Sequence, residues 1–392
     1  MNKSIRIILY ILLLVVFISG MTYFYQYLTG LEFQPHPENP NIPSRTSTNN
    51  GNDTQSGKQA PQQETVAENL RVPWEIVFLP NGNILVTERP GAIVQISNDL
   101  TKRYEIANVE HIGEGGLLGM ALHPDFDNNQ WIYIYKTTLE NGRLRNQVER
   151  YIFKDGFTDR FLILDDIPAD ANHNGGRIEF GPDGKLYVTT GDAGNGDLAQ
   201  NTSSLAGKIL RINDDGSIPN DNPFSNEVWS YGHRNPQGLA WDGNGRLWAT
   251  EHGRSGFASG YDELNLIERG NNYGWPIIQG NETRQGMTTP VQHSGASNTW
   301  APAGLTYHDN RLYFGGLRGT SIYVAHLNEQ GGLITIAQHP KHDIGRIRAV
   351  KHGPDGYIYL TTSNTDGRGE PKQNDDKIFK YALENFIAAD SY

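Results

Sequence analysis

One pattern of apolar and polar positions recurs six times along the chain. Each copy contains a short apolar strand, a turn rich in Asp, Asn or Gly, and a second strand with aromatic or β-branched residues. The copies are WEIVFLPNGNILVTE (74–88), LLGMALHPDFDNNQWIYIY (117–135), GRIEFGPDGKLYVTT (176–190), QGLAWDGNGRLWATE (237–251), AGLTYHDNRLYFGG (303–316) and RAVKHGPDGYIYLTT (348–362). Strands joined by N-G and P-D-G turns are typical of β-hairpins, so each copy predicts one hairpin.

The spacing of the six hairpins predicts the fold. The copies are spread over residues 67–392 with a period of about 54 residues, which is typical of a four-stranded propeller blade. A β-sandwich would not need the same turn phrase six times. We therefore predict an all-β, six-bladed β-propeller of four-stranded antiparallel blades over residues 67–392. Because the first strand of each propeller blade lines the central channel, the residues just before each copy should ring one mouth of it.

The first 30 residues carry a membrane signal. Lys3 and Arg6 precede an uncharged stretch over 7–31, close to the ~20 residues that a membrane-spanning helix needs. We predict an uncleaved signal-anchor over residues 1–30, which would hold the folded domain on the extracellular or periplasmic side of the membrane. A cleaved signal peptide, with secretion of the rest, is the alternative. Residues 31–66 are rich in Pro, Asn, Ser, Thr and Gln and predict a disordered linker.

Composition narrows the classes of function. The chain has 33 Lys and Arg against 44 Asp and Glu, and its net charge of −11 argues against a nucleic-acid partner. It has no Cys, which excludes disulfides, a thiolate nucleophile and thiolate metal sites. The charges up to residue 66 cancel, so the acidic excess belongs entirely to the predicted propeller.

Arginines gather in the segments that should ring one mouth, despite this acidic balance. They are Arg177, Arg234, Arg318, Arg346 and Arg348. Surface charge explains most arginines in any chain. Guanidinium groups clustered by topology instead predict a pocket for a compact polyanion, whose carboxylates or phosphates they bind through paired donors. No P-loop or dinucleotide fingerprint is present, so an ordinary nucleotide is not favoured.

His173 is the candidate general base at this mouth. An imidazole accepts a proton near neutral pH, and Gly175 and Gly176 leave backbone space beside it for a ligand. Asp192 ends the returning strand of the same hairpin and would hold the imidazole in one tautomer. The alternatives are a structural histidine and a carboxylate that serves only its local turn.

The Gly-rich segment 251–276 is a candidate metal site. It contains Asp262 and Glu263 among several glycines. Carboxylates and the backbone carbonyls of glycine loops are hard oxygen ligands, which suit Ca²⁺. We therefore predict that Ca²⁺ binds in this segment.

The chain resembles one known family in six phrases that occur in the family's order. They are PWEIVFLPNG, GEGGLLG, HNGGRIEFGPDGKLYVTTGD, SYGHRNPQGLAW, DELNLIERGNNYGWP and GRIRAVKHGPDG. The family is that of the soluble glucose dehydrogenases and aldose sugar dehydrogenases (glucose/sorbosone dehydrogenases), six-bladed propellers that use pyrroloquinoline quinone (PQQ). The resemblance covers residues 67–385, and several phrases in order make it specific.

The resemblance implies a role for particular residues. His173 matches the catalytic base and Asp192 its carboxylate partner. The other matches are Arg318, Arg346 and Arg348 for the cofactor carboxylates, Arg234 and Asn235 for the quinone oxygens, Gly253 and Arg254 for a Ca²⁺ at the quinone, and Glu263 with Tyr273 for a structural Ca²⁺. Two cofactor-binding positions depart from the family. Glu114 stands where members carry Gln, and Arg318 stands where they often carry Lys.

The implied reaction is oxidation of the anomeric C1 hydroxyl of an aldose to a lactone. Hydride passes to PQQ while His173 takes the hydroxyl proton. The substrate would be an aldose or a related small alcohol, and the sequence names neither the electron acceptor nor the oligomeric state. A Ca²⁺-dependent propeller lactonase and a non-catalytic propeller binding module are the alternatives, because a fold alone does not specify a function.

Overall fold

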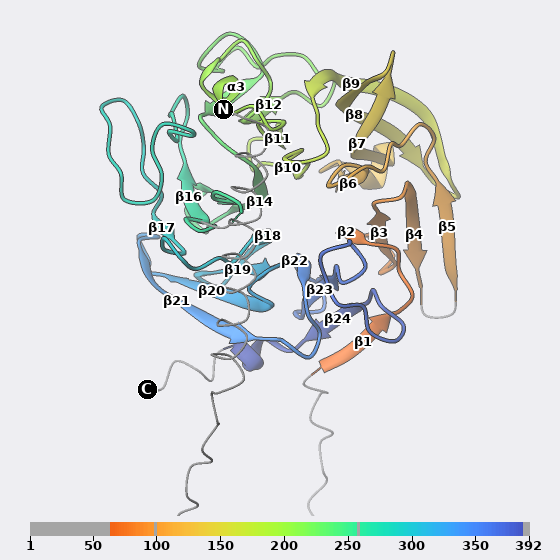
Figure 1. Ribbon diagram of the computed structural model, residues 1–392. Helices are drawn as coiled ribbons and strands as arrows, with labels where there is room; N and C mark the ends of the chain where they lie inside the picture. Colours follow the sequence, from red (N-terminus) through yellow and green to blue (C-terminus); the bar gives the residue numbers. More distant parts are fainter. Residues whose placement is uncertain (1–62, 98–99, 257–258, 387–392) are drawn as a thin grey trace, which may run out of the picture. The chain divides into compact units, whose positions relative to one another are not determined.

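Six four-stranded antiparallel sheets are arranged like the blades of a propeller (Figure 1). The computed structural model describes residues 63–97, 100–256 and 259–386. The predicted all-β, six-bladed propeller of four-stranded blades is thereby confirmed. Each repeated phrase forms the two inner strands of one blade.

The first three blades follow the chain outward from the centre. Blade 1 contains β2 (Pro73–Phe78), β3 (Ile84–Glu88), β4 (Ala92–Ile96) and β5 (Thr101–Glu105). Blade 2 contains β6 (Leu117–Leu122), β7 (Trp131–Glu140), β8 (Arg143–Phe153) and β9 (Phe157–Pro168). Blade 3 contains β10 (Ile178–Phe180), β11 (Leu186–Thr190), β12 (Lys208–Ile212) and β13 (Val228–Tyr231).

Blades 4 and 5 repeat this order, and blade 6 closes the ring. Blade 4 contains β14 (Pro236–Trp241), β15 (Leu247–Glu251), β16 (Glu263–Ile267) and β17 (Gln292–His293). Blade 5 contains β18 (Pro302–His308), β19 (Arg311–Gly316), β20 (Ser321–Leu327) and β21 (Leu333–Pro340). Blade 6 contains β22 (Ile347–His352), β23 (Ile358–Thr362), β24 (Ile378–Tyr381) and β1 (Gln63–Ala67).

The outer strand of blade 6 comes from the other end of the domain. β1 pairs antiparallel with β24, with Gln63 opposite Tyr381. The predicted linker boundary at residue 66 is therefore wrong by a few residues, since 63–66 belong to this strand. A polar, mostly exposed edge strand carries little hydrophobic signal, and only its pairing partner at the far end of the sequence reveals it.

The predicted signal-anchor and residues 31–62 of the predicted linker lie outside the described residues. Helices are few and short in the part of the chain that the structure describes: α2 (Phe126–Asn129), α3 (Gly196–Gln200) and the 3₁₀ turn η1 (Leu383–Phe386). None of the helices found there has the length and apolar character to span a bilayer.

The hairpin turns form as their sequence predicts. Between β10 and β11, Gly184 adopts φ +70°, a left-handed conformation that glycine tolerates without strain. Its N–H donates to the Gly181 carbonyl at 2.9 Å, which closes the turn. Because this turn joins adjacent antiparallel strands, β11 ends at the same mouth of the channel at which β10 begins.

The second strand of a blade is buried on both faces because each blade packs between two neighbours. All five residues of β3, β11, β15 and β23 are buried. A threonine in three of these strands accepts a backbone N–H from the neighbouring inner segment: Thr87 from Glu75, Thr189 from Arg177 and Thr361 from Ala349, at 2.9–3.0 Å. These bonds fix the start of the inner segments, where the chain enters the channel mouth.

Candidate active site

A cavity of 480 Å³ lies at the mouth that the loops before the inner strands form. It is lined by eight of the predicted site residues: Glu114, His173, Arg234, Gly253, Arg254, Arg318, Arg346 and Arg348. They come from five different blades, Arg348 from strand β22 and the others from segments that flank the inner strands, so the ring closure is what brings them together. The polyanion pocket predicted from topology therefore has a physical counterpart.

His173 lies between a carboxylate and a guanidinium. Its Nδ1 is 2.7 Å from Asp192 Oδ1, and its Nε2 is 2.8 Å from Arg234 Nη2. A guanidinium only donates hydrogen bonds, so Nε2 must accept and the imidazole proton lies on Nδ1, facing Asp192. The unprotonated Nε2 is thus the nitrogen that faces Arg234 at the cavity wall.

Asp192 is held ionised although it is almost fully buried. Burial by itself raises the pKa of this carboxyl, but hydrogen bonds from His173, from the Trp275 indole N–H (2.8 Å) and from the Gly194 backbone N–H (2.9 Å) outweigh it and lower the pKa. Asp192 does not line the cavity but stands behind His173, where a tautomer-fixing carboxylate belongs.

The backbone around His173 explains the glycines of its phrase. His173 has φ +59°, a left-handed conformation for a non-glycine residue. A Cβ on Gly175 would lie 2.6 Å from the Thr189 carbonyl oxygen, and one on Gly191 would lie 1.9 Å from the carbonyl oxygen of His173. A side chain at either glycine would therefore clash with the opposite segment of the hairpin. The close approach of these two segments brings His173 and Asp192 together.

The arginines at the cavity differ in their partners. Arg346 forms an ion pair with Asp366 at 2.8 Å. Arg348 is 6% exposed and donates to the Gln237 amide oxygen at 2.8 Å, while its Nε is buried without a hydrogen bond. Burial lowers the pKa of Arg348 to about 9. Arg318 is exposed and donates to Ser259 at 3.0 Å.

Three cavity arginines lack an anionic partner. Among the described residues, no carboxylate pairs with Arg234, Arg318 or Arg348, although Arg234 and Arg348 are almost fully buried. The neighbouring His252 also has a buried Nε2 without a hydrogen bond, and burial lowers its pKa to about 4. A buried cation without a counter-ion is unfavourable, so this wall is suited to an anionic ligand.

One predicted cofactor contact, Asn235, and one predicted ring arginine, Arg177, do not line the cavity. Asn235 is 1% exposed and is not among the cavity-lining residues; its side-chain oxygen accepts from the Gly175 backbone N–H (2.9 Å) and from Gln237 (3.1 Å). Arg177, which the sequence placed in the arginine ring, is not among the lining residues; it contacts Glu75, and its guanidinium lies 4.2 Å from the centre of the Trp74 ring. The ring prediction was wrong for Arg177, because its guanidinium is held by Glu75 and the Gln237 carbonyl.

The predicted calcium residues divide into two groups. Gly253 and Arg254 line both the main cavity and a smaller neighbouring one, whereas Glu263 and Tyr273 line only the smaller one. The Tyr273 hydroxyl donates to the Leu266 carbonyl at 2.5 Å, so this hydroxyl is already engaged. Asp262 is engaged too, since it accepts from Gly253, Thr299, Trp300 and Ala301 at 2.7–2.9 Å.

Glu263 retains the character of a cation ligand. Burial and the nearby Glu251 raise its pKa to about 8. Asn265 donates to both carboxylates, at 3.0 Å to Glu263 and 3.4 Å to Glu251, and its own side-chain oxygen is buried without a hydrogen bond. No group of three or more His, Asp or Glu side chains close enough to hold a metal occurs in the described part of the chain.

Several residues of the cavity were missed by the sequence reasoning. Among the lining residues they are Asp170, Gln237, His252 and Arg368. Asp366 and Trp275 do not line the cavity but contact Arg346 and Asp192. Arg368 and Asp366 follow β23 in the phrase TDGRGEP, after the second strand of the hairpin. The positions of Arg368 and Asp366 could have been predicted from the sequence, because the loop after the second strand of a blade reaches the same mouth as the loop before its first strand.

Comparisons with known proteins identify the family of the chain. A family model described as glucose/sorbosone dehydrogenase matches residues 70–370. Aldose sugar dehydrogenase YliI of Escherichia coli (strain K12) is 31% identical over 346 residues, covering 78% of this chain and 90% of the relative. Quinoprotein glucose dehydrogenase B of Acinetobacter calcoaceticus is 36% identical over 275 residues, covering 60% of this chain and 56% of the relative.

A solved structure extends the similarity to the backbone. The PQQ-bound form of aldose sugar dehydrogenase from Streptomyces coelicolor has a TM-score of 0.75 and 37% identity, covering 81% of this chain and 96% of that chain. The resemblance found in the six phrases is confirmed, and the matched range contains the cavity-lining residues from Trp74 to Arg368. This chain therefore belongs to the glucose/sorbosone dehydrogenase family.

Proposed function

We propose that this protein is a PQQ-dependent sugar dehydrogenase that oxidises the C1 hydroxyl of an aldose to a lactone. The observation that carries the proposal is the combination of a tautomer-fixed imidazole, His173, with three arginines that lack a carboxylate partner among the described residues. PQQ is a planar tricarboxylate, so its charge complements Arg234, Arg318 and Arg348. The PQQ-bound relative from Streptomyces coelicolor supports this choice of anion.

The residues present fit such a cofactor. Arg348 has a buried Nε without an acceptor, and His252 has a buried Nε2 without a partner, both in the cavity wall. Arg318, Arg346 and Arg348 would hold the carboxylates, and Arg234 would donate to the quinone oxygens. Asn235 would act through the loop it supports, because its oxygen holds Gly175. When bound, the quinone would supply the acceptor for the hydride of the sugar.

The chain's own part in the reaction is proton transfer and charge placement. The Nε2 of His173 takes the proton of the C1 hydroxyl as the C1 hydride leaves, and Asp192 stabilises the resulting imidazolium through Nδ1. The sugar hydroxyl replaces Arg234 as the partner of Nε2, and Arg234 then points its donors toward developing negative charge. The C1 carbon becomes the lactone carbonyl.

We propose that Ca²⁺ binds at both predicted places. Gly253 and Arg254 line the main cavity, where the Gly253 carbonyl, and the Arg254 carbonyl once released from the Gly260 N–H (3.2 Å), would be hard oxygen ligands for the cation. The second place centres on Glu263, where the half-buried Glu263 carboxylate, the buried Glu251 carboxylate and the unpartnered Asn265 oxygen would gain a counter-ion. The Tyr273 hydroxyl would stay with Leu266 and contribute packing only.

We also propose that residues 1–30 anchor the domain outside the cytoplasm, where it passes electrons to an acceptor that the chain does not identify. The support is the uncharged stretch after Lys3 and Arg6. Membrane fractionation of the full chain and of a chain that starts at Gln63 tests the anchor. Full-length protein found only in the soluble fraction contradicts it.

The function is tested by reconstitution. The purified chain is titrated with PQQ and Ca²⁺ while the visible absorption is followed, and dye reduction is then measured with a panel of aldoses. We expect saturable binding and sugar-dependent dye reduction, with a loss of about 10²–10⁴-fold in kcat for His173→Ala. Lactone hydrolysis by the cofactor-free chain would favour a lactonase. Failure to bind PQQ would favour a binding module, and either result rejects the proposal.

A further inference from the structure

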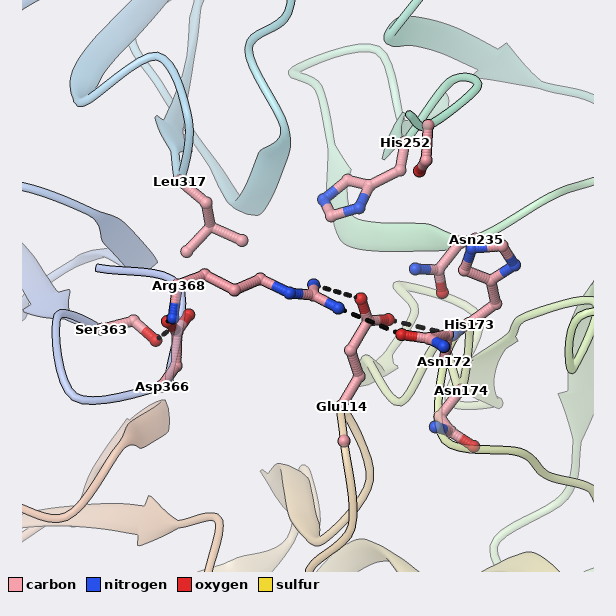
Figure 2. A network of polar contacts seen from close by, with 12 residues as sticks. Glu114, Asn172, His173, Asn174, Asn235, His252, Leu317, Ser363, Asp366 and Arg368 are labelled. Carbon is pink, nitrogen blue, oxygen red and sulfur yellow. Dashed lines mark hydrogen bonds and ion pairs between the residues drawn. The ribbon is translucent and has the colours of Figure 1, made fainter. Parts of the chain in front are cut away.

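Glu114 joins three loops at the wall of the cavity (Figure 2). One carboxylate oxygen accepts from Arg368 Nη1 at 2.5 Å, and the other accepts from the backbone N–H of His173 at 2.9 Å. Arg368 comes from the loop after β23 in blade 6, and His173 from the loop before β10 in blade 3. The contact with His173 is made to its main chain, not to its imidazole.

The loop that carries His173 needs such an anchor. The left-handed φ of +59° costs a non-glycine residue about 1–2 kcal/mol, which the surroundings must offset. Glu114 forms two hydrogen bonds to this loop: its backbone N–H donates to the Ala171 carbonyl at 2.7 Å, and its carboxylate accepts from the backbone N–H of His173. The imidazole can then reach Asp192 and Arg234 at the same time.

The negative charge of Glu114 strengthens the hydrogen bonds that its carboxylate accepts. Burial raises the pKa of its carboxyl, but Arg368, His252 and the His173 N–H outweigh that effect and lower the pKa to about 2. An ionised carboxylate accepts a hydrogen bond roughly twice as strongly as a neutral group. Arg368 also donates to the Asn172 side-chain oxygen at 3.0 Å, so it holds the residue just before His173 as well.

We propose that Glu114, held by Arg368, is a positioning residue that keeps the backbone of His173 in the conformation its imidazole requires. This proposal rests on the function proposed above, but it assigns to Glu114 a task different from binding the cofactor. Arg368 pairs with Glu114 and thereby offsets the negative charge that Glu114 would otherwise present to an anionic ligand.

Substitution at position 114 separates positioning from cofactor binding. Glu114→Ala removes the acceptor, and we expect kcat to fall about 10–100-fold with KM for the sugar and Kd for PQQ changed less than about threefold. Glu114→Gln keeps an acceptor for the His173 N–H, so it should restore kcat to within about fivefold of wild type. The matched control is Asp166→Ala, which breaks a 2.5 Å bridge to Arg145 at an exposed site and should leave kcat unchanged.

A second readout needs no cofactor. Nitrogen-15 NMR of histidine-labelled, cofactor-free chain reports the His173 tautomer, with the signal assigned by its loss in His173→Gln. Wild type and Glu114→Gln should show the Nδ1–H form, and Glu114→Ala should show a mixture of the two tautomers. If Glu114→Ala does not fold, Arg368→Gln provides the same comparison and should give a smaller change in the same direction.

The outcomes separate the two proposals. Wild-type protein that binds no PQQ or oxidises no sugar rejects the function, while the tautomer measurement still decides the role of Glu114. An unchanged tautomer and kcat in Glu114→Ala overturn the positioning role. A Glu114→Gln variant as slow as Glu114→Ala overturns it too, because hydrogen-bond acceptance would then not be the property that matters.

Discussion

The pair of His173 and Asp192 offers a test of how the site sets its base. Asp192 accepts three hydrogen bonds, from His173 Nδ1 (2.7 Å), the Gly194 N–H (2.9 Å) and the Trp275 indole N–H (2.8 Å). Asparagine at this position has one oxygen and one NH₂ group. If the amide oxygen takes the place of Oδ1, it accepts from His173 and Gly194, and the NH₂ group faces the Trp275 N–H. If the side chain is flipped, the NH₂ group faces the N–H groups of His173 and Gly194 instead.

Either orientation of the amide has a cost that can be worked from these contacts. A buried donor left without an acceptor costs about 1–3 kcal/mol, and loss of the charge beside the imidazolium removes a charge-assisted bond of about 1.5–3 kcal/mol. Only the second loss grows in the transition state, where His173 gains its proton. At about 1.4 kcal/mol for each factor of ten, we expect kcat of Asp192→Asn to fall about 10–100-fold.

The assay is steady-state dye reduction by the PQQ-reconstituted chain, with the His173 tautomer followed by nitrogen-15 NMR. The matched control is Asp183→Asn, a carboxylate in the turn between β10 and β11 that pairs with Arg211 at 2.9 Å and lies outside the cavity. It should leave kcat within about twofold of wild type while lowering stability slightly. An Asp192→Asn variant with kcat within twofold of wild type refutes the assignment of Asp192 as the partner of the base.

Three further predictions follow from burial and close contact. Arg348→Met should weaken PQQ binding about 10–100-fold in a fluorescence titration. The cofactor-free variant should be as stable to urea as wild type or more stable, because an apolar group replaces a buried cation without a carboxylate partner. Tighter PQQ binding or a marked loss of stability contradicts this prediction. Glu263 has its pKa raised from 4.5 to about 8, so the folded chain holds a proton that the unfolded chain releases, and stability should fall as pH rises through that window. Added Ca²⁺ should restore the stability lost at the higher pH, and Glu263→Gln should abolish both the pH dependence and the Ca²⁺ effect in urea titrations at pH 5 and 8. If Ca²⁺ stabilises the variant as much as wild type, the cation does not bind at Glu263. Gly191→Ala places a Cβ 1.9 Å from the His173 carbonyl oxygen and should cost about 1–3 kcal/mol by chemical unfolding, more than Gly156→Ala, whose Cβ would meet only a Tyr104 ring carbon at 3.9 Å.

Local signals were sufficient for the elements and for part of the site. The six turn phrases predicted the inner hairpins, because a turn and its two strands are specified by neighbouring residues. His173 and Asp192 were paired correctly for the same reason, since they end the two strands of one hairpin. Glu114, Arg234, Arg318, Arg346 and Arg348 were placed at the mouth from their position before or after an inner strand.

The errors arose where contacts join distant parts of the chain. Arg177 directly precedes an inner strand, as Arg346 does, but its guanidinium contacts Glu75, which lies 102 residues earlier. The closing strand β1 was assigned to the linker, because its partner β24 lies at the other end of the domain. Arg368 was missed although it reaches Glu114 across 254 residues of sequence.

From the amino-acid sequence alone one can read the blade repeat, the family and the pairing of His173 with Asp192, because hairpin periodicity and short phrases are local properties. The folded domain adds which charges are paired, which stay unpaired and which side chain holds which loop. Arg346 and Arg348 are two residues apart, yet one meets Asp366 and the other has a buried nitrogen without an acceptor. Pairing depends on distance and burial in space, and these arise only when closure of the ring brings loops from different blades together.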